Sequence, residues 1–229
     1  RAKKMGIIQD IYQMPADTEQ AEALALIDKL NADPTINGVM VQLPAPKQID
    51  ADELLERIDP NKDVDGLTPA NIGRLWMEDH FIEPATAEGI IALLKHYQIK
   101  LDGKNVVVVG RSNIVGKPLA ALMLEQNATV TICHLHTQNL GEITKKADIV
   151  VSATGQAFLI TADMVKDGAV VVDVGMNHVN GKLVGDVDFD NVKEKASYIT
   201  PVPGGVGPLT VQFLMEAVVK LTRRQNGRE

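Results

Sequence analysis

Cysteine is almost absent from this sequence, and aromatic residues are scarce. Cys133 is the only cysteine among 229 residues, so no internal disulfide can form, and we expect a reducing, cytoplasmic environment. Aromatic residues make up only 3% of the chain. No apolar run approaches the length of a membrane span, and no signal-peptide pattern is present, so no membrane partner is expected.

Positive charge is also in short supply. Lysine and arginine number 23 against 30 acidic residues, which gives a net charge of −7. This balance argues against nucleic acid or an anionic membrane as the main partner, so any phosphate group must be bound at a local site. The 45% hydrophobic and 23% charged content is ordinary for a globular protein with a real core.

An initiating methionine is missing as well. The first six residues read Arg-Ala-Lys-Lys-Met-Gly, which is typical of the last turn of a helix that a glycine closes at its C-terminus. We therefore expect the sequence to begin inside a domain.

The stretch that organises the rest of the sequence is a strand, a loop and a helix. Residues 106–109 are four valines, which suit a buried parallel strand, and Gly110 ends it. A helix is expected after Gly116, with Pro118 in its first turn, where the missing N–H costs little. This order presents backbone N–H groups and a helix N-terminus to an anion.

The loop departs from the common G-x-G-x-x-G pattern, because Ser112 stands where the second glycine would be. An ordinary tight turn would need Gly110 but not the whole loop, and we therefore favour a dinucleotide site. The residues expected to contact the cofactor are Gly110, Arg111, Ser112, Ile114, Val115, Gly116, Thr154 and Gly155.

Further strands are expected at residues 128–133, 148–152 and 169–174, alternating with helical segments. A helix from Thr86 to about Tyr97, capped by Thr86, precedes them. This alternation predicts a doubly wound nucleotide-binding domain. Small residues at 153–155 let a cofactor lie close, whereas Asp173 and Asn177 are interpreted as turn formers.

The strand at 128–133 ends in His134, Leu135 and His136, where an NAD site usually places an acidic residue for the ribose 2′-hydroxyl. No acidic residue stands there, and Arg111 in the phosphate loop would attract a 2′-phosphate. NADP is therefore expected in preference to NAD. We assign no catalytic role to either histidine.

The first part of the chain also alternates between strand and helix. Strands are expected at residues 7–12 and 39–43, with a helix between them that begins at a capping box formed by Asp17 and Gln20. Ligands sit beyond the carboxyl ends of parallel strands, and Gln42 lies one residue before such an end. Gln42 is equally consistent with a polar residue on a sheet edge.

A short helix at about 51–58 is followed by a polar turn at residues 61–66 that holds two carboxylates and a lysine. The turn is not an EF-hand loop, because Arg74 occupies the position of the required glutamate. A solvated turn is one interpretation. The other is a receptor for a planar N–H/NH₂ edge, since Asp65 accepts two parallel bonds while Gly66 lets the ligand approach.

A proline- and glycine-rich segment at residues 200–210 is too unusual for a linker. Proline fixes its backbone while glycine removes side chains, so the loop has a defined shape and can press flat against an aromatic ring. Pro208 is expected to open a final apolar helix that ends in Arg223 and Arg224, whose charges suit a helix C-terminus.

Four of these motifs occur together in one order: residues 41–46, 62–66, 110–118 and 201–210. With them the sequence closely resembles the family of bifunctional methylenetetrahydrofolate dehydrogenases/methenyltetrahydrofolate cyclohydrolases. The resemblance runs nearly the full length of the chain. Four motifs in the family's order are far more specific than any one of them.

The resemblance implies two α/β domains, a homodimer and an active-site cleft between the domains. The expected folate-binding catalytic domain covers residues 1–84, N-terminally incomplete, and is completed by a C-terminal helix at 208–229 that packs back onto it. A Rossmann-type NADP-binding domain covers 85–207. The implied reactions are hydride transfer from 5,10-methylenetetrahydrofolate to NADP⁺ and hydrolysis of the methenyl product to 10-formyltetrahydrofolate.

The resemblance also implies residue roles. Asp65 would hold the pterin amino edge, and Gln42 matches a family glutamine that tunes a catalytic lysine; these two are the expected catalytic residues. The folate and nicotinamide pocket would be lined, besides Asp65, by Pro203, Gly204, Gly205, Gly207 and Pro208.

Two departures from the family bear on function. The family carries Tyr-x-x-x-Lys on the helix before the segment that starts here at Arg1, and neither Lys3 nor Lys4 matches that lysine. Since this lysine is the general acid/base of hydrolysis, we expect the cyclohydrolase step to be impaired in the chain as written. Leu135 replaces a common serine near the 2′-phosphate, so the NADP preference depends more heavily on Arg111.

Two other functions stay open on the sequence. One is a nucleotide-binding module with a regulatory or scaffolding role and no turnover. The other is a different two-domain dehydrogenase acting on amino or hydroxy acids, which would be expected to supply a Lys or His base, and none matches a motif here.

Overall fold

The computed structural model describes residues 2–228, which divide into two compact units. Unit 1 comprises the residues up to Gly73 together with those from Leu214 on, and unit 2 spans Arg74–Phe213. The sequence places the domain boundaries instead at 84/85 and 207/208. Both boundaries of the structure fall inside helices, α3 (Pro69–Trp76) and α8 (Gly207–Gln225).

Unit 2 is built on a five-stranded, fully parallel sheet with the strand order β2-β1-β3-β4-β7. This order confirms the predicted doubly wound domain, and its topological switch point lies between β1 and β3. The strands are β1 (Asn105–Val109), β2 (Thr129–Cys133), β3 (Ile149–Ser152), β4 (Val170–Asp173) and β7 (Tyr198–Ile199).

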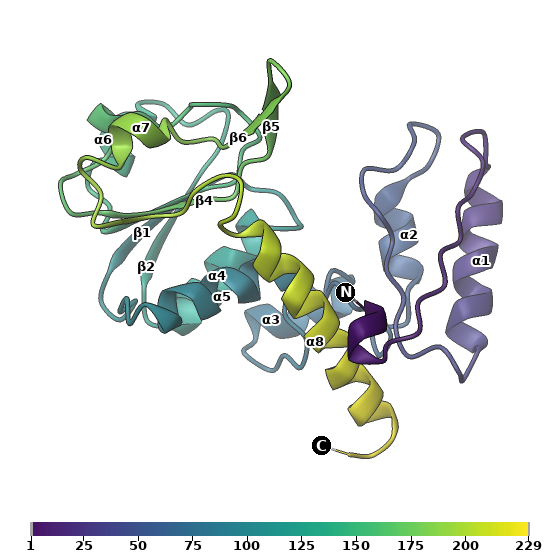
Figure 1. Cartoon of the computed structure of the whole chain (residues 1–229). Helices are drawn as coiled ribbons and strands as arrows, with labels where there is room; N and C mark the ends of the chain where they lie inside the picture. Colours follow the sequence, from purple (N-terminus) through teal and green to yellow (C-terminus); the bar gives the residue numbers. More distant parts are fainter. Residues whose placement is uncertain (1, 229) are drawn as a thin grey trace. The chain divides into compact units, whose positions relative to one another are not determined.

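Helices cover both faces of this sheet, as Figure 1 shows. Side chains alternate between the faces of a strand, so Val107 and Val150 point to the face covered by α6 (Leu140–Thr144) and α7 (Phe189–Val192). The opposite face carries α4 (Ala85–His96) and α5 (Gly116–Glu125). Burial on both faces explains why the inner strands β1, β3 and β4 are rich in valine, whereas the edge strand β2 alternates with threonine and is partly exposed.

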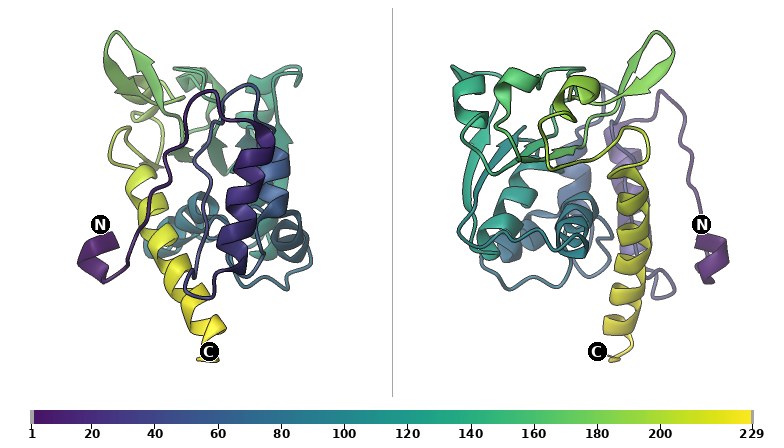
Figure 2. Two further views of the ribbon diagram at one scale, coloured as in Figure 1. Left: turned by 90° about the vertical axis from the view of Figure 1, so that its right-hand side faces the viewer. Right: turned by 60° about the vertical axis from the view of Figure 1, so that its left-hand side comes forward.

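A two-stranded antiparallel hairpin, β5 (Asn177–Val179) and β6 (Lys182–Val184), extends from the sheet of unit 2 (Figure 2). Its turn is formed by Asn180 and Gly181, with φ of +51° and +76°. Two successive positive φ values match the type I′ turn that Asn-Gly favours. The sequence interpretation missed this hairpin, although the Asn-Gly pair was a usable signal.

Two of the predicted helix caps are wrong. α4 begins after Pro84, and the hydroxyl of Thr86 contacts the Thr210 hydroxyl at 3.0 Å instead of capping the helix. α1 (Gln20–Ala32) has Glu19 at its N-cap without a side-chain hydrogen bond. The Gln20 amide bonds across to the backbone of Asp50, because a long-range partner satisfies it better than its own helix end.

Unit 1 packs α1 against α2 (Ala51–Arg57) around Ile27, Leu54 and Ile58. The N-terminal turn is confirmed as a short 3₁₀ helix, η1 (Ala2–Met5), followed by Gly6 at φ +75°. A second 3₁₀ helix, η2 (Ala162–Met164), lies in unit 2. Among residues 2–228, no helix combines the length and hydropathy needed to cross a membrane.

Neither strand predicted for unit 1 forms, so that part of the prediction is wrong. Ile8 and Ile11 are 91% and 80% exposed, and residues 8–12 form no backbone ladder with any described segment. In the second stretch Val39 forms only an isolated parallel bridge to Asp63. A strand needs a continuous partner for its N–H and C=O groups, and alternating apolar residues do not supply one.

A buried lysine determines where the polar turn at 61–66 lies. Lys62 is 8% exposed, and its ammonium donates to three carbonyl oxygens at the C-terminal end of α1, those of Leu30, Asn31 and Asp33, at 2.7–3.0 Å. These are carbonyls that a helix end leaves without partners, and a cation there also suits the helix dipole. Lys62 thereby anchors the turn to α1.

We predict that Lys62→Met lowers the free energy of unfolding of unit 1 by about 2 kcal/mol, since three carbonyls lose a charged donor. Urea unfolding followed by far-UV circular dichroism measures the change. Lys29→Met, which alters an exposed lysine of α1, is the matched control. Equal midpoints for the two variants would contradict the anchoring role.

Candidate functional site

Two glycines let three backbone segments meet at the switch point of the sheet. Gly110, at φ +125°, ends β1, and a Cβ there would fall on the carbonyl of Ala153, which follows β3. A Cβ on Gly116 would fall on the carbonyl of Gly110. The predicted phosphate loop and the predicted small-residue turn are therefore in direct backbone contact at the carboxyl ends of β1 and β3.

The loop joins β1 to the N-terminus of α5, and Ser112 engages the first backbone N–H groups of that helix. Ser112 Oγ accepts hydrogen bonds from the backbone N–H groups of Val115 and Gly116 at 3.2 and 3.4 Å, so it holds the loop against the start of α5. Ile114 is 42% exposed. Arg111 is exposed, and its guanidinium has no hydrogen bond or ion pair with any described residue. A cation without a partner beside a helix N-terminus suits a phosphate.

A buried carboxylate that sequence reasoning missed holds the turn after β3. Asp186 is fully buried, and its Oδ2 accepts from Thr154 N at 2.7 Å, Thr154 Oγ1 at 2.9 Å and Ser152 Oγ at 3.1 Å, with Gly155 N at 3.3 Å. Its Oδ1 accepts from the amide of Asn177 at 2.9 Å. Thr154 and Gly155, both predicted cofactor contacts, therefore have their positions set by one side chain.

A second buried carboxylate supports the first. Asp173, at the end of β4, accepts three backbone N–H bonds at 2.9 Å, from Gly175, Asp186 and Val187. Burial raises the pKa of Asp173, and these N–H groups oppose the rise. A Cβ on Gly175 would fall on the Asp186 carboxylate, and one on Gly185 on the Asp173 carboxylate. The two acids form a shared framework, and Asp173 is a turn former as interpreted.

The proline- and glycine-rich loop follows β7 and therefore starts from the same edge of the sheet. Thr200 Oγ1 accepts from Asp173 N at 2.8 Å, which ties the start of the loop to β4. Gly204 has φ +104°, and a Cβ on Gly205 would fall near the carbonyl of Pro201. The loop is therefore shaped by its backbone. The exposed lining candidates are Pro203, Gly204, Gly207 and Pro208.

Unit 1 carries the other two predicted site residues on neighbouring segments. Val39 N donates to Lys62 O at 2.7 Å and Val64 N to Val39 O at 3.3 Å, so the two segments run parallel from this bridge. Gln42 and Asp65 lie two or three residues beyond it. The Gln42 amide donates to its neighbouring Leu43 carbonyl at 3.0 Å and is exposed.

Asp65 is the electrostatically unusual residue of unit 1. Burial, followed by the negative charge of Asp63, raises the pKa of Asp65 from 3.8 to about 7. Lys62 does not neutralise it, since its ammonium donates to the end of α1. Asp63 itself accepts from Thr68 N and the Asn71 amide at 2.8 and 2.9 Å. No described residue offers Asp65 a donor or a cation, so its carboxylate is available to a ligand.

The structure thus brings together the predicted cofactor residues and the Pro203–Pro208 loop at the carboxyl edge of one sheet. It brings Gln42 and Asp65 onto adjoining segments of the other unit. The two sets belong to different units.

A parallel, doubly wound sheet with a glycine-lined switch point defines a dinucleotide-binding domain. Here it is one of two units, and the other holds an acidic side chain available to a ligand. These features define the class of two-unit, nucleotide-dependent enzymes.

Comparison with known proteins makes the class specific. The model of the tetrahydrofolate dehydrogenase/cyclohydrolase NAD(P)-binding domain matches residues 84–226, and that of the catalytic domain matches residues 1–65. The chain belongs to the tetrahydrofolate dehydrogenase/cyclohydrolase family. It is 87% identical over 228 residues to a bifunctional protein FolD from Lactobacillus helveticus, a match that covers 100% of this chain and 81% of that relative.

Solved structures agree with this family. A FolD methylenetetrahydrofolate dehydrogenase/cyclohydrolase from Campylobacter jejuni is 47% identical, with a TM-score of 0.94, over 97% of this chain and 80% of its own. The enzyme of Trypanosoma brucei, solved with NADP cofactor and an inhibitor, is 38% identical with a TM-score of 0.94, over 100% and 80%. The two-domain α/β fold expected from the sequence is confirmed.

We predict that Asp186→Asn raises the dissociation constant for NADP⁺ at least about tenfold, because an amide nitrogen in place of one carboxylate oxygen leaves buried donors unpaired. Isothermal titration calorimetry measures the constant, and circular dichroism checks that the variant is folded. Asp190→Asn, at an exposed position of the same unit, is the control. Unchanged NADP⁺ affinity in Asp186→Asn would show that the turn at 153–155 does not contact the cofactor.

Proposed function

We propose that this protein oxidises 5,10-methylenetetrahydrofolate to 5,10-methenyltetrahydrofolate with NADP⁺ and hydrolyses the product to 10-formyltetrahydrofolate. The observation that carries the dehydrogenase part is the contact of Gly110, Gly116 and Ala153 at the β1/β3 switch point, beside the unpaired Arg111. Family membership supplies the substrate class. The matches give no support to a regulatory module without turnover.

The residues at the switch point fit a dinucleotide phosphate. A side chain at Gly110 would collide with the carbonyl of Ala153 and one at Gly116 with the carbonyl of Gly110, so these glycines allow the close packing that brings the start of α5 to the loop. A helix N-terminus in that place suits a pyrophosphate. Arg111 supplies the charge for a 2′-phosphate, and Thr154 and Gly155 form the opposite wall of the loop. Bound NADP⁺ would supply the hydride acceptor, and the protein aligns it with the substrate.

Asp65 is proposed to bind the amino edge of the pterin. A carboxylate accepts two parallel N–H bonds from such an edge. The neighbouring Lys62 donates to the end of α1 and not to Asp65, so both carboxylate oxygens can accept from a ligand. Because burial opposes its charge, Asp65 gains from a ligand that supplies N–H donors. The bare Pro203–Pro208 loop, with Gly204, Gly205 and Gly207, is proposed to lie flat against the rings.

The hydrolytic step rests on family membership, because no lysine in the printed sequence matches the family lysine. Gln42 is proposed as a positioning residue for that step. We also propose a homodimer, on the basis of the family resemblance. A cytoplasmic location is proposed on the same basis, and the single cysteine, Cys133, which is buried, is consistent with it.

Arg111→Ala is expected to raise KM for NADP⁺ at least about tenfold and to change KM for NAD⁺ less than about twofold, because only NADP⁺ carries the 2′-phosphate. Steady-state rates with each cofactor measure this. Arg223→Ala, on the exposed part of α8, is the control. Equal losses with both cofactors would place Arg111 at the pyrophosphate instead.

Asp65 also links pH to stability and binding. Its folded-state pKa of about 7 lies above the ordinary 3.8, so the folded protein holds a proton that the unfolded chain releases as pH rises between these values. Stability therefore falls over this window. Asp65→Asn should remove that fall and, allowing for partial exposure, stabilise the protein at pH 8 by about 1–2 kcal/mol.

The same variant tests the function. Substrate affinity of the wild type should rise between pH 6 and 8 as Asp65 ionises, whereas Asp65→Asn should lose at least about 100-fold in kcat/KM while unfolding at no lower temperature. NADPH formation and thermal unfolding measure the two effects. A stable Asp65→Asn enzyme with wild-type kcat/KM would contradict the role of Asp65 in substrate binding.

A further inference from the structure

A groove lies at the edge of the sheet opposite the proposed cofactor site. It occupies about 260 Å³ where β1, β3, β4 and β7 begin, and its wall includes Tyr97, Lys100, Lys104, Asp148, Lys166 and Tyr198. Because β1 is five residues long, about 16 Å of strand separates this groove from the loop that begins at Gly110. The groove therefore has no part in the proposed dehydrogenase site.

Two aromatic rings form one side of this groove. Tyr97 follows α4 and Tyr198 starts β7, and their ring centroids are 5.8 Å apart with an interplanar angle of 54°. Both side chains are about half exposed, at 53% and 47%. Aromatic residues are only 3% of this chain, so two of its three tyrosines meeting at one exposed groove is a distinct concentration. Exposed ring faces of this kind are where a planar ring stacks.

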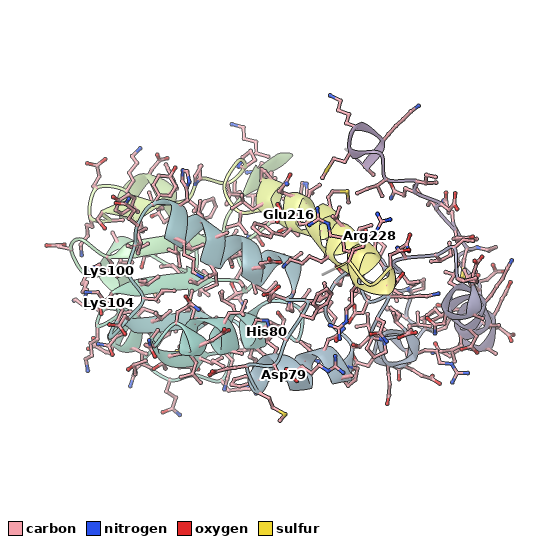
Figure 3. The ribbon with its side chains drawn as sticks, turned by 90° about the horizontal axis from the view of Figure 1, so that it is seen from below. Asp79, His80, Lys100, Lys104, Glu216 and Arg228 are labelled. Carbon is pink, nitrogen blue, oxygen red and sulfur yellow. The ribbon has the colours of Figure 1, made fainter. Side chains whose placement is uncertain are left out.

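The charge of the groove is positive, in contrast to the net charge of −7. Its one carboxylate, Asp148, is already engaged: it pairs with Lys166 at 2.5 Å and accepts from Asn105 N at 2.8 Å, and these contacts lower its pKa. Lys100 and Lys104, labelled in Figure 3, have no hydrogen bond or ion pair with a described residue. Lys104 acts on Asp148 only through space.

The backbone carbonyls at the end of α4 already accept hydrogen bonds and are not directed at an anion in the groove. The end of α4 is closed, because the N–H groups of Tyr97, Gln98 and Ile99 donate to the carbonyls of Leu93, Lys95 and Leu94. A Cβ added to Gly168, on the groove wall, would have no other atom within 4 Å, so the groove is open on that side. The two unpaired ammonium groups therefore dominate the local electrostatics.

We propose that this groove binds a small phosphate ester that carries a planar ring, of the mononucleotide class. The ring stacks on the face of one of the two inclined tyrosines, Tyr97 and Tyr198, and contacts the edge of the other, and the phosphate pairs with Lys100 and Lys104. The proposal depends only on this edge of unit 2 and not on the activity proposed above.

The test uses adenosine 5′-monophosphate as the probe and the whole protein saturated with NADP⁺, so that the switch-point site is occupied. Amide shifts in ¹H–¹⁵N NMR should change saturably at the groove, around Lys100, Lys104 and Gly168, with a dissociation constant below about 1 mM. Adenosine and inorganic phosphate, each lacking one recognised part, should bind at least about fivefold more weakly.

Variants separate the two contacts. The double change Lys100→Gln/Lys104→Gln and the single change Tyr97→Ala should each weaken the probe at least about fivefold. Lys145→Gln/Lys146→Gln, at two exposed lysines outside the groove, should leave binding within about twofold. Circular dichroism confirms the fold of each variant.

The proposal is overturned by any of the following results. These are no saturable shift with the probe, shifts that centre on the loop at 110–116, or affinity that the groove variants leave unchanged. Inorganic phosphate binding as tightly as the nucleotide would also overturn it, because the groove would then recognise an anion and not a ring.

Discussion

The close approach of three backbone segments at the β1/β3 switch point is the constraint on which the rest of unit 2 depends. Gly110, Gly116 and Ala153 meet with no room for a Cβ at either glycine, so the start of α5 is pressed against the end of β1. The carboxyl ends of parallel strands lie at one edge of the sheet, and this contact places the N-terminus of α5 at that edge. We propose that Arg111, the one side chain of that loop with an unpaired positive charge, sets the cofactor preference.

Buried charged groups support both proposed sites in the same manner, because their hydrogen bonds hold a turn or a helix end in place. Asp186 and Asp173 accept N–H bonds from the turns after β3 and β4, and Lys62 donates to the end of α1. Burying a charged group costs free energy unless the group forms hydrogen bonds. The segments that supply those hydrogen bonds are therefore held in one position. Asp65 is the exception. Burial and the charge of Asp63 raise the pKa of its carboxyl group, and no described residue donates a hydrogen bond to it. That imbalance is why we propose Asp65 as a ligand contact and not as a structural acid.

Local patterns were sufficient for much of unit 2. Short apolar segments, three of them rich in valine, predicted four of its parallel strands, and Pro118 marked the first turn of α5, because those signals act within a few residues. Local sequence patterns did not predict interactions between residues that are far apart in the chain. The role of Asp186 could not be predicted because it depends on a hydrogen bond with Thr154, which is distant in sequence. Likewise, the Thr86 hydroxyl contacts Thr210 and does not cap its helix. The strand expected at 7–12 failed because strand formation depends on a partner, which its own residues do not reveal.

We propose that the dinucleotide binds at the switch point between β1 and β3. A crystal structure of the protein with NADP⁺ would show where the cofactor lies. We expect the pyrophosphate over the N-terminus of α5, within hydrogen-bond distance of backbone N–H groups between Gly110 and Gly116, and the 2′-phosphate beside Arg111. Cofactor density at any other edge of the sheet, or a pyrophosphate that touches neither the loop nor the turn at 153–155, would contradict it.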